Sequence, residues 1–502
     1  MTNSEDTELN QRYVEGASEC VGRTAVEDVH VVSTRSNSSS TAGSVSNYAG
    51  EQSVPDKQGS SRDDDLPEGQ VTLQKTKAGF FSPRLRNHRR KIIEKFLFTN
   101  VLLGSFVIAI LSIYWGATYK RSHYMFKVSV LAVIQDESDL IETTMSAILP
   151  ALIAGIPCTW HIFSAAQFSD RYNVPADQID GKVRSLIHDE KYWMALNVRA
   201  NATDALYDSL TGGSTPFNST DYFQGIYESG RDPATVSSAI VPNMRQLETI
   251  YGSYLRDDYL PSLFGNLTDS ISSERIMAAS DLKFNYIDQR PFYDAQILAP
   301  LQVGLIYCLL LTFFQLSLFG PLHGEMAKIL KPKHMILYRI GIAWLTYFFL
   351  SLFFCAVSAI FQIDFTKAFG RGGFIVYWMS TWLLMMALGG ANENMISLII
   401  TFGPQYLGFW LMTWIVLNIS CSFYPLVLNN QFYRYGYAMP IHNGVDIYKV
   451  IFLDLSKHKM ARNYGILVAW VALNTALLPF VLKTVGKRMQ KKAAAAAAAA
   501  NR

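Results

Sequence analysis

Residues 96–119, FLFTNVLLGSFVIAILSIYWGATY, form an uncharged apolar run of more than twenty residues. A helix of this length crosses the ~30 Å hydrocarbon core of a bilayer. Six basic residues precede it within twelve positions: Arg84, Arg86, Arg89, Arg90, Lys91 and Lys95. Because basic flanks stay in the cytoplasm, this stretch predicts a first span that leaves the N-terminus inside. The same basic segment suits anionic lipid headgroups, and the two interpretations are compatible.

The composition is typical of a membrane protein. Of 502 residues, 50% are hydrophobic, 13% aromatic and only 17% charged, with a mean hydropathy of +0.12. These figures exclude collagenous, disulfide-scaffold and wholly disordered proteins. The net charge of +3 is too small to predict a nucleic-acid partner. The five cysteines show no metal-binding spacing, and we expect no metal site and no cofactor.

Five more apolar runs follow a long polar segment. They cover residues 298–318, 340–363, 374–388, 404–428 and 465–482. The run at 374–388 leads into residues 389–394, GGANEN, which we interpret as an inner turn or a break in a helix. Five basic residues close the last run: Lys483, Lys487, Arg488, Lys491 and Lys492. The sequence therefore predicts a membrane all-α helical bundle of six spans, five of them within 297–487, with both termini cytoplasmic.

Residues 120–296 are predicted to form a mixed α/β extracytoplasmic domain inserted between spans 1 and 2. Residues 126–134 begin with alternating and end with continuous apolar residues, which indicates a strand that enters a core. Three glycosylation sequons begin at Asn201, Asn218 and Asn266. All three lie in the segment that the charge rule already places outside, so we expect a glycoprotein.

One apolar stretch competes with this topology. Residues 145–163 are long enough to be considered as a span, but Pro150 and Pro157 interrupt them. Proline removes backbone donors that lipid cannot replace, and a span here would place the sequons in the cytosol. We therefore interpret the stretch as a buried or interfacial helix-turn.

The two ends have biased compositions. Residues 1–78 are acidic and rich in Ser, Thr and Gly, which predicts a disordered cytoplasmic tail. Residues 79–95 are the basic juxtamembrane segment. Residues 488–502 form a basic and poly-alanine cytoplasmic end, and the alanines are expected to extend the last helix.

Candidate functional residues lie within or beside the spans, where polar groups are costly. Asn392, Glu393 and Asn394 offer a carboxylate and two amides, and Arg339 lies at the mouth of the third span. These residues are predicted to bind a substrate or an ion. The alternatives are a Glu393 that faces cytosolic water and an Arg339 that reaches the interface. Residues 432–454 are interrupted by Pro440 and several tyrosines, so we predict a re-entrant or interfacial helix pair, with a plain loop as the alternative.

No phosphate-binding loop, nucleophile elbow or zinc-protease motif occurs in the sequence, so we expect no catalytic residues and no enzyme. Any uphill transport would then need an ion gradient or a separate ATPase.

Five short motifs occur in order around the predicted spans: YWGAT at 114–118, IHDEKYWMAL at 187–196 with NAT at 201–203, AFGRGGF at 368–374, GANEN at 390–394 and YGYAMPIHN at 435–443. With them, the chain resembles the fungal nitrosoguanidine-resistance membrane protein family over residues 91–487. Its layout is also similar to the permease-like relatives of type-2 ABC exporters and of bacterial phage-infection proteins. The resemblance implies a multi-pass plasma-membrane protein linked to drug resistance and lipid homeostasis.

Two functional hypotheses remain open. The first is a permease-like protein that exports or moves drugs, amphipathic compounds or lipids. The second is a non-transporting regulator or scaffold of plasma-membrane organisation. The expected partners are membrane lipids, a small amphipathic substrate, and a second copy or another membrane protein. The expected location is the plasma membrane, with the endoplasmic reticulum membrane as the alternative.

Overall fold

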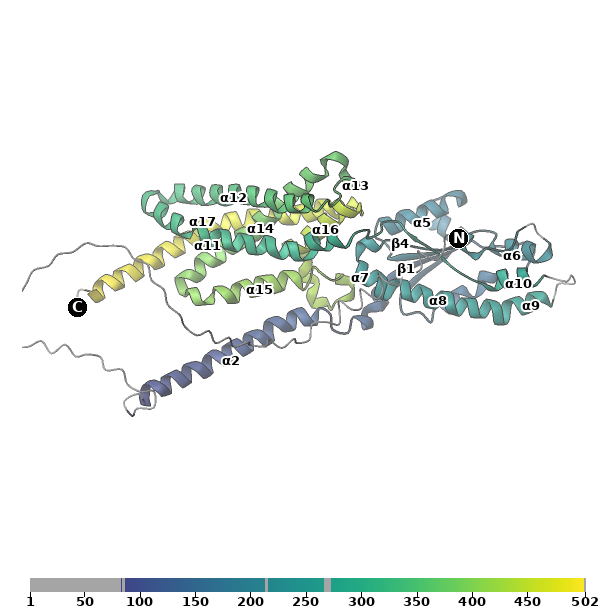
Figure 1. The fold of residues 1–502 in the computed structure, drawn as a ribbon, viewed down its shortest axis with the longest axis horizontal. Helices are drawn as coiled ribbons and strands as arrows, with labels where there is room; N and C mark the ends of the chain where they lie inside the picture. Colours follow the sequence, from purple (N-terminus) through teal and green to yellow (C-terminus); the bar gives the residue numbers. More distant parts are fainter. Residues whose placement is uncertain (1–82, 84–85, 213–214, 266–271, 501–502) are drawn as a thin grey trace, which may run out of the picture. The chain divides into compact units, whose positions relative to one another are not determined.

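The computed structural model describes residues 83, 86–212, 215–265 and 272–500 (Figure 1). The predicted disordered tail at 1–78 and the sequon residue Asn266 lie outside the described residues. Phe80–Arg502 form one unit. The described chain is mostly helical, and its buried hydrophobic residues form separate cores around a mixed sheet and among long helices.

Five helices of the described chain are long and apolar enough to cross a bilayer. Their helical segments are α2 (Arg86–Gly116), α11 (Gly304–Ile329), α12 (Pro332–Ile360), α14 (Gly373–Phe402) and α17 (Met460–Ala500). Figure 1 shows α11, α12, α14 and α17 side by side, and the four share one hydrophobic core. The poly-alanine run continues α17, as predicted.

The predicted span at 404–428 contains a much shorter helix. Helix α15 (Leu407–Ile419) has 13 residues, and only short 3₁₀ turns follow it up to Ala438. A 13-residue α-helix is ~20 Å long, which is less than the ~30 Å of a bilayer core. Residues 404–428 therefore do not form one full-length helix, because Pro425 and the polar residues around it end the helical pattern early, and a sixth span stays a prediction.

Residues 389–394, which were predicted to form an inner turn or a break in a helix, lie inside the continuous helix α14. The helix runs without a break from Gly373 to Phe402 and contains GGANEN in its interior. Gly and Asn have low helix propensity, but tertiary packing overrides this preference. Residues 389 and 391–394 are buried, so Glu393 does not face cytosolic water.

Helices α12 and α14 pack antiparallel. Arg339, near the start of α12, contacts Glu393 in the second half of α14. Ser358, near the end of α12, lies 3.2 Å from the hydroxyl of Tyr377, near the start of α14. Two contacts at opposite ends fix the direction of this pair.

The predicted α/β domain contains a five-stranded mixed sheet in the order β2-β1-β3-β4-β5. β1 is parallel to β2 and β3, β3 is antiparallel to β4, and β4 is parallel to β5. The strands are β1 (Ser129–Ile134), β2 (Thr159–Ser164), β3 (Met194–Val198), β4 (Phe223–Tyr227) and β5 (Asn285–Asp288). β1 confirms the strand predicted from residues 126–134.

Helices cover both faces of this sheet. Because side chains alternate along a strand, Leu131 and Val133 of β1 enter one core, and Val130 and Ala132 enter the other. Helices α4 (Ala165–Tyr172) and α5 (Ile179–His188) pack on the first core. The second core contains α3 (Leu149–Ile153), α6 (Ala202–Thr211), α8 (Val241–Tyr254), α9 (Leu260–Phe264) and α10 (Ser273–Ser280).

Residues 145–163 form a buried helix-turn and a strand, not a long helix. Met145, Leu149 and Ile153 are buried in the core of the sheet domain, and β2 begins at Thr159. The interpretation as a buried helix-turn is confirmed for the first half of the stretch.

Helix α16 (Pro440–Leu453) lies where a re-entrant or interfacial helix pair was predicted. Eleven of its fourteen residues are buried, and it contacts α14, α15 and α17, so it is not a plain loop. Only one true α-helix is present, because residues 431–438 form a 3₁₀ helix instead.

The sheet domain is attached to the C-terminal end of α16. Arg290, after β5, donates from Nε to the Asp454 carbonyl and from Nη2 to its carboxylate, both at 2.9 Å. Nearby, Lys449 Nζ donates to the carbonyl of Arg231 in the sheet domain at 2.8 Å.

Candidate functional site

A buried ion pair lies among the long helices. Arg339 Nε of α12 donates to Glu393 Oε1 of α14 at 2.8 Å, and both side chains are 8% exposed. Glu393 lies nine residues before the end of α14 at Phe402, or ~14 Å along the helix. Arg339 lies seven residues after the first residue of α12, Pro332. Two of the four predicted site residues are therefore in direct contact.

Asn392 points to a different pair of helices. Its amide donates to Thr312 Oγ1 of α11 at 3.0 Å, and its oxygen accepts from Trp410 Nε1 of α15 at 3.0 Å. Successive residues of an α-helix point ~100° apart, which explains why Asn392 and Glu393 reach different neighbours. Asn392 therefore connects three helices.

Asn394 faces α17. It donates to the carbonyl of Asn474 at 3.0 Å, and Asn474 in turn donates to the carbonyl of Ala387 at 3.2 Å. A cavity of about 20 Å³ lies beside Glu393, Asn394, Asn474 and Tyr347. This volume suffices for about one water molecule. We call Arg339, Glu393, Asn392, Asn394 and Asn474 the membrane polar cluster.

The two glycines of GGANEN provide space for this cluster. A Cβ at Gly389 would overlap the ring and hydroxyl of Tyr347 on α12, and a Cβ at Gly390 would lie 2.7 Å from Cβ of Asn474. The glycines therefore allow close helix approach, and not the backbone freedom of a turn.

The sequence reasoning missed Thr312, Tyr347 and Asn474. Asn474 lies in the middle of an apolar run, so its polarity was a usable signal. Thr312 and Tyr347 occur with many similar residues in their helices, and no pattern in one sequence distinguishes them.

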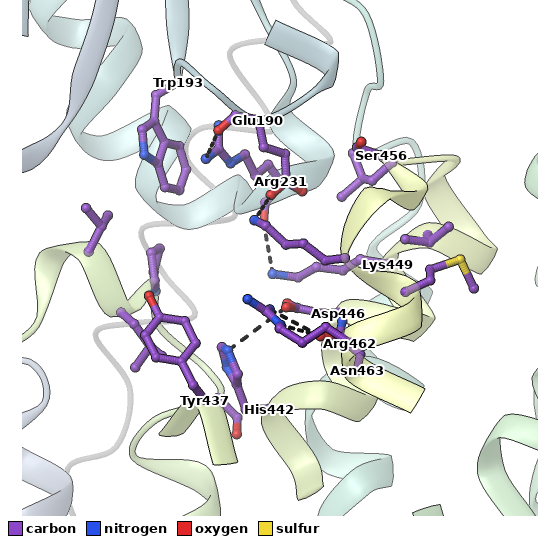
Figure 2. A pocket seen from close by; sticks show the side chains of 18 of the residues that line it. Glu190, Trp193, Arg231, Tyr437, His442, Asp446, Lys449, Ser456, Arg462 and Asn463 are labelled. Atoms are coloured by element: carbon purple, nitrogen blue, oxygen red, sulfur yellow. Dashed lines mark hydrogen bonds and ion pairs between the residues drawn. The ribbon is translucent and has the colours of Figure 1, made fainter. Parts of the chain in front are cut away.

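A second, larger site lies where the sheet domain meets α16 and the start of α17 (Figure 2). We call it the junction pocket. Its volume is about 390 Å³. Figure 2 shows Glu190, Trp193 and Arg231 of the sheet domain on one side, and Lys449, Asp446 and Arg462 of α16 and α17 opposite them. Two of the quoted motifs contribute to this site, IHDEKYWMAL through Glu190, Lys191 and Trp193 and YGYAMPIHN through Tyr437 and His442. No pattern in the sequence predicted that these distant segments meet.

Cationic side chains predominate in the junction pocket. Six line it: Lys127, Lys191, Arg231, Lys449, Lys459 and Arg462. The lining carboxylates are Glu190 and Asp446, so the formal excess is four positive charges. Lys459 is paired with Glu190. Arg231 also stacks on Trp193, with its guanidinium carbon 3.9 Å from the ring centre.

His442 of α16 also lines the junction pocket. Its Nε2 lies 4.0 Å from Asp446 Oδ2. Burial lowers the pKa of His442, although Asp446 counteracts this by favouring the charged form. The ring is therefore neutral at pH 7 and adds no charge to the excess.

The sequon residues within the described chain lie on the surface of the sheet domain. Asn201 and Asn218 are both exposed, as glycan attachment requires. Glycosylation stays a prediction at both positions.

Five long apolar helices with a mixed sheet domain after the first define a multi-pass membrane protein. The chain belongs to a family of proteins of unknown function, DUF3533, whose model matches residues 99–476. It is 48% identical over 471 residues to YJR015W of Saccharomyces cerevisiae, an uncharacterized endoplasmic reticulum membrane protein. That alignment covers 90% of this chain and 92% of the relative. No solved structure matches the chain significantly. The resemblances to nitrosoguanidine-resistance proteins and to exporter permeases stay predictions.

Proposed function

We propose that the protein is a permease-like membrane protein that moves amphipathic compounds or lipids across its membrane, and so contributes to drug resistance and lipid homeostasis. The observation that carries this proposal is the buried Arg339–Glu393 pair. Ionisable side chains inside a membrane are expensive and mark substrate, ion or proton pathways in many membrane proteins. Such a role involves binding and movement, without a covalent change in the substrate.

The proposal includes six crossings, with α15 and the turns after it as the fifth. The rings of Phe106 in α2 and Phe409 at the start of α15 lie 4.5 Å apart. Further along α2, the carbonyl of Ile113 accepts a bond from Tyr433, which follows α15 in sequence. The two helices therefore run in the same direction. This direction is the one expected of the fifth of six crossings, which would put both termini on one side of the membrane and the sheet domain on the other. The basic flanks of the first and last spans favour the cytoplasmic side for the termini.

For location, we favour the endoplasmic reticulum membrane over the plasma membrane. Support comes from YJR015W, whose name places that relative in the endoplasmic reticulum. A lumenal sheet domain would still expose its sequons to glycosylation there.

A regulator or scaffold that does not transport is the second candidate. The cavity beside Glu393 holds about one water, and the polar side chains around it are closely packed. A cluster of this kind also suits a structural role, in which hydrogen bonds specify how the helices pair.

Reconstitution separates the two candidates. The full-length protein is placed in vesicles with a fluorescent phospholipid, and movement between leaflets is followed with an external quencher, with and without ATP and a proton gradient. Export of an amphipathic dye is measured in parallel. We expect movement faster than in protein-free vesicles under at least one condition. Rates equal to those of protein-free vesicles throughout would overturn transport and favour the scaffold.

A further inference from the structure

We propose that the junction pocket is a binding site for a phosphate group, presented either by a lipid headgroup or by a small free phosphate compound. The site does not depend on the proposed transport, because a bound phosphate is equally compatible with a regulator. The inference rests on the charge, the hydrogen-bond partners and the dimensions of the pocket.

Three of the cations have neutral partners. Lys449 donates to the backbone carbonyl of Arg231 at 2.8 Å. Arg231 itself donates to the carbonyl of Tyr192 at 2.8 Å. Arg462 donates from Nε and Nη2 to Asn463 Oδ1 at 3.3 and 3.2 Å. These hydrogen bonds position the cations, and their acceptors carry no charge. Arg231 also lies near four carboxylates that favour its charged form, those of Glu190, Glu228, Asp232 and Asp446.

The two lining carboxylates cannot balance the remaining charge. Glu190 is bonded to Lys459, and Asp446 lies beside the neutral ring of His442. A concave site with excess charge of one sign focuses its field on a ligand of the opposite sign. The pocket therefore favours an anion.

Phosphate suits this excess better than a monocarboxylate. A phosphomonoester carries nearly two negative charges and accepts hydrogen bonds on three oxygens. Arg231, Lys449 and Arg462 come from different segments and line the same pocket, and Figure 2 shows Lys449 between the two arginines, so together they offer donors to more than one oxygen of a phosphate. A single carboxylate would leave most of the excess charge uncompensated.

The dimensions fit a headgroup or a small compound. A volume of about 390 Å³ is near the lower end of ligand sites, which run from ~300 to 1,000 Å³. Arg462 and Lys191 are exposed, whereas Trp193 is buried in the wall. A ligand thus meets exposed cations first and partly buried ones further in.

Binding is measured on the full-length protein in detergent by calorimetric titration with inorganic phosphate and with sn-glycerol 3-phosphate. Wild type is expected to bind at least one of them at millimolar concentration or below. The glycerol phosphate titration is repeated in nanodiscs of phosphatidylcholine with and without phosphatidic acid. Competition by phosphatidic acid identifies a lipid headgroup as the source, and retained binding identifies a free phosphate compound.

Variants test the pocket itself. Arg462→Gln and Lys449→Gln are each expected to weaken binding about tenfold, because each removes a charged donor. Lys449→Arg is expected to retain binding. Arg184→Gln, on exposed Arg184 of α5 outside the pocket, makes the same change in net charge and should bind like wild type. No binding of either probe by wild type, or equal binding by both glutamine variants and wild type, would overturn the proposal.

Discussion

The membrane polar cluster and the junction pocket differ in charge balance: the charges of the cluster compensate each other, whereas the pocket has an excess of positive charge. In the cluster, Arg339 and Glu393 neutralise each other, and both are almost fully buried. In the pocket, six cations face two carboxylates beside open space. Lipid surroundings require charges to be compensated within the protein, whereas water allows an excess to persist until a ligand binds. Charge balance therefore separates the compensated pair from the pocket, whose excess positive charge suits an anionic ligand.

The largest expected effect comes from removing one partner of the buried pair. Arg339→Met leaves Glu393 buried without a counter-charge, so we expect a loss of ~3–5 kcal/mol in the free energy of unfolding. Denaturant-induced unfolding in detergent, followed by tryptophan fluorescence, measures this loss. The double variant Arg339→Met with Glu393→Gln removes both charges and should recover most of it. A double variant as unstable as the single one would contradict charge compensation.

The same residues test the function. Glu393→Gln is expected to lower drug resistance or lipid movement while the amount of protein in the membrane stays normal. The double variant adds a control, because it lacks the pair without leaving a charge unpaired. Loss of activity in a stable double variant assigns a functional role to the pair. Full activity in both variants would make the pair purely structural.

A smaller effect is expected from the helix contacts that enclose the cluster. Gly390→Ala places a Cβ 2.7 Å from that of Asn474, so we expect a loss of ~1–3 kcal/mol from overpacking. Gly341→Ala on α12 is the matched control, because no atom lies within 4 Å of its added Cβ. The control should be neutral or slightly stabilising, since alanine favours helices. Equal effects of the two substitutions would show that close approach of α14 and α17 is not required.

In the sheet domain, compensated charge produces a pH dependence. Burial opposes ionisation of Asp180, but hydrogen bonds from Asn197, Gln135 and Arg199 outweigh it and hold the pKa of this carboxyl below its usual range. Its stabilisation is therefore present above the ordinary aspartate pKa of ~4 and is lost as the pH falls through the lower, folded-state pKa. We expect Asp180→Asn to cost ~1–2 kcal/mol at pH 7. Thermal unfolding from pH 7 down to 3 should show the difference from wild type shrink.

Glu228 provides a control of opposite sign. Burial raises the pKa of Glu228 despite a 3.0 Å bond from His188, so the folded state disfavours its charge. Glu228→Gln should therefore stabilise the protein at pH 7, and the gain should vanish at low pH, where both states of the wild type are protonated. A parallel pH dependence for the two variants would contradict these directions.

The smallest effect on the fold is expected from glycan removal. If the sheet domain is lumenal, endoglycosidase should increase the gel mobility of the yeast-expressed protein. Substitution of Asn201, Asn218 and Asn266 together by Gln should abolish this increase. Cleavage of the sheet domain by protease added to the cytosolic side of sealed vesicles would contradict the topology.

Long apolar runs and strand β1 were predictable, because hydropathy and alternation act over neighbouring residues. The continuity of α14 was not, since GGANEN resembles a turn until Tyr347 and Asn474 fill the space beside its glycines. The early end of α15 was not predicted either, because apolar composition alone does not set where a helix ends.

The candidate sites divide in the same way. Arg339 and Glu393 were predictable as polar residues at apolar runs, and the structure places them in direct contact. Asn392 and Asn394 were predicted together but face different helices. The junction pocket brings together Arg231, Lys449 and Arg462 from segments far apart in the sequence, and no local pattern predicts that arrangement.

Helix α16 links the sheet domain to the long apolar helices. Its far end is held by Arg290 through Asp454, and its sides pack against α14 and α17. A rotation of the sheet domain would therefore strain the Arg290–Asp454 bonds and the packing of α16 against the two helices that contain Glu393 and Asn474. The Lys449 bond to the Arg231 carbonyl and the Lys459–Glu190 pair also join the sheet domain to α16 and the start of α17, so such a rotation would have to break several contacts together.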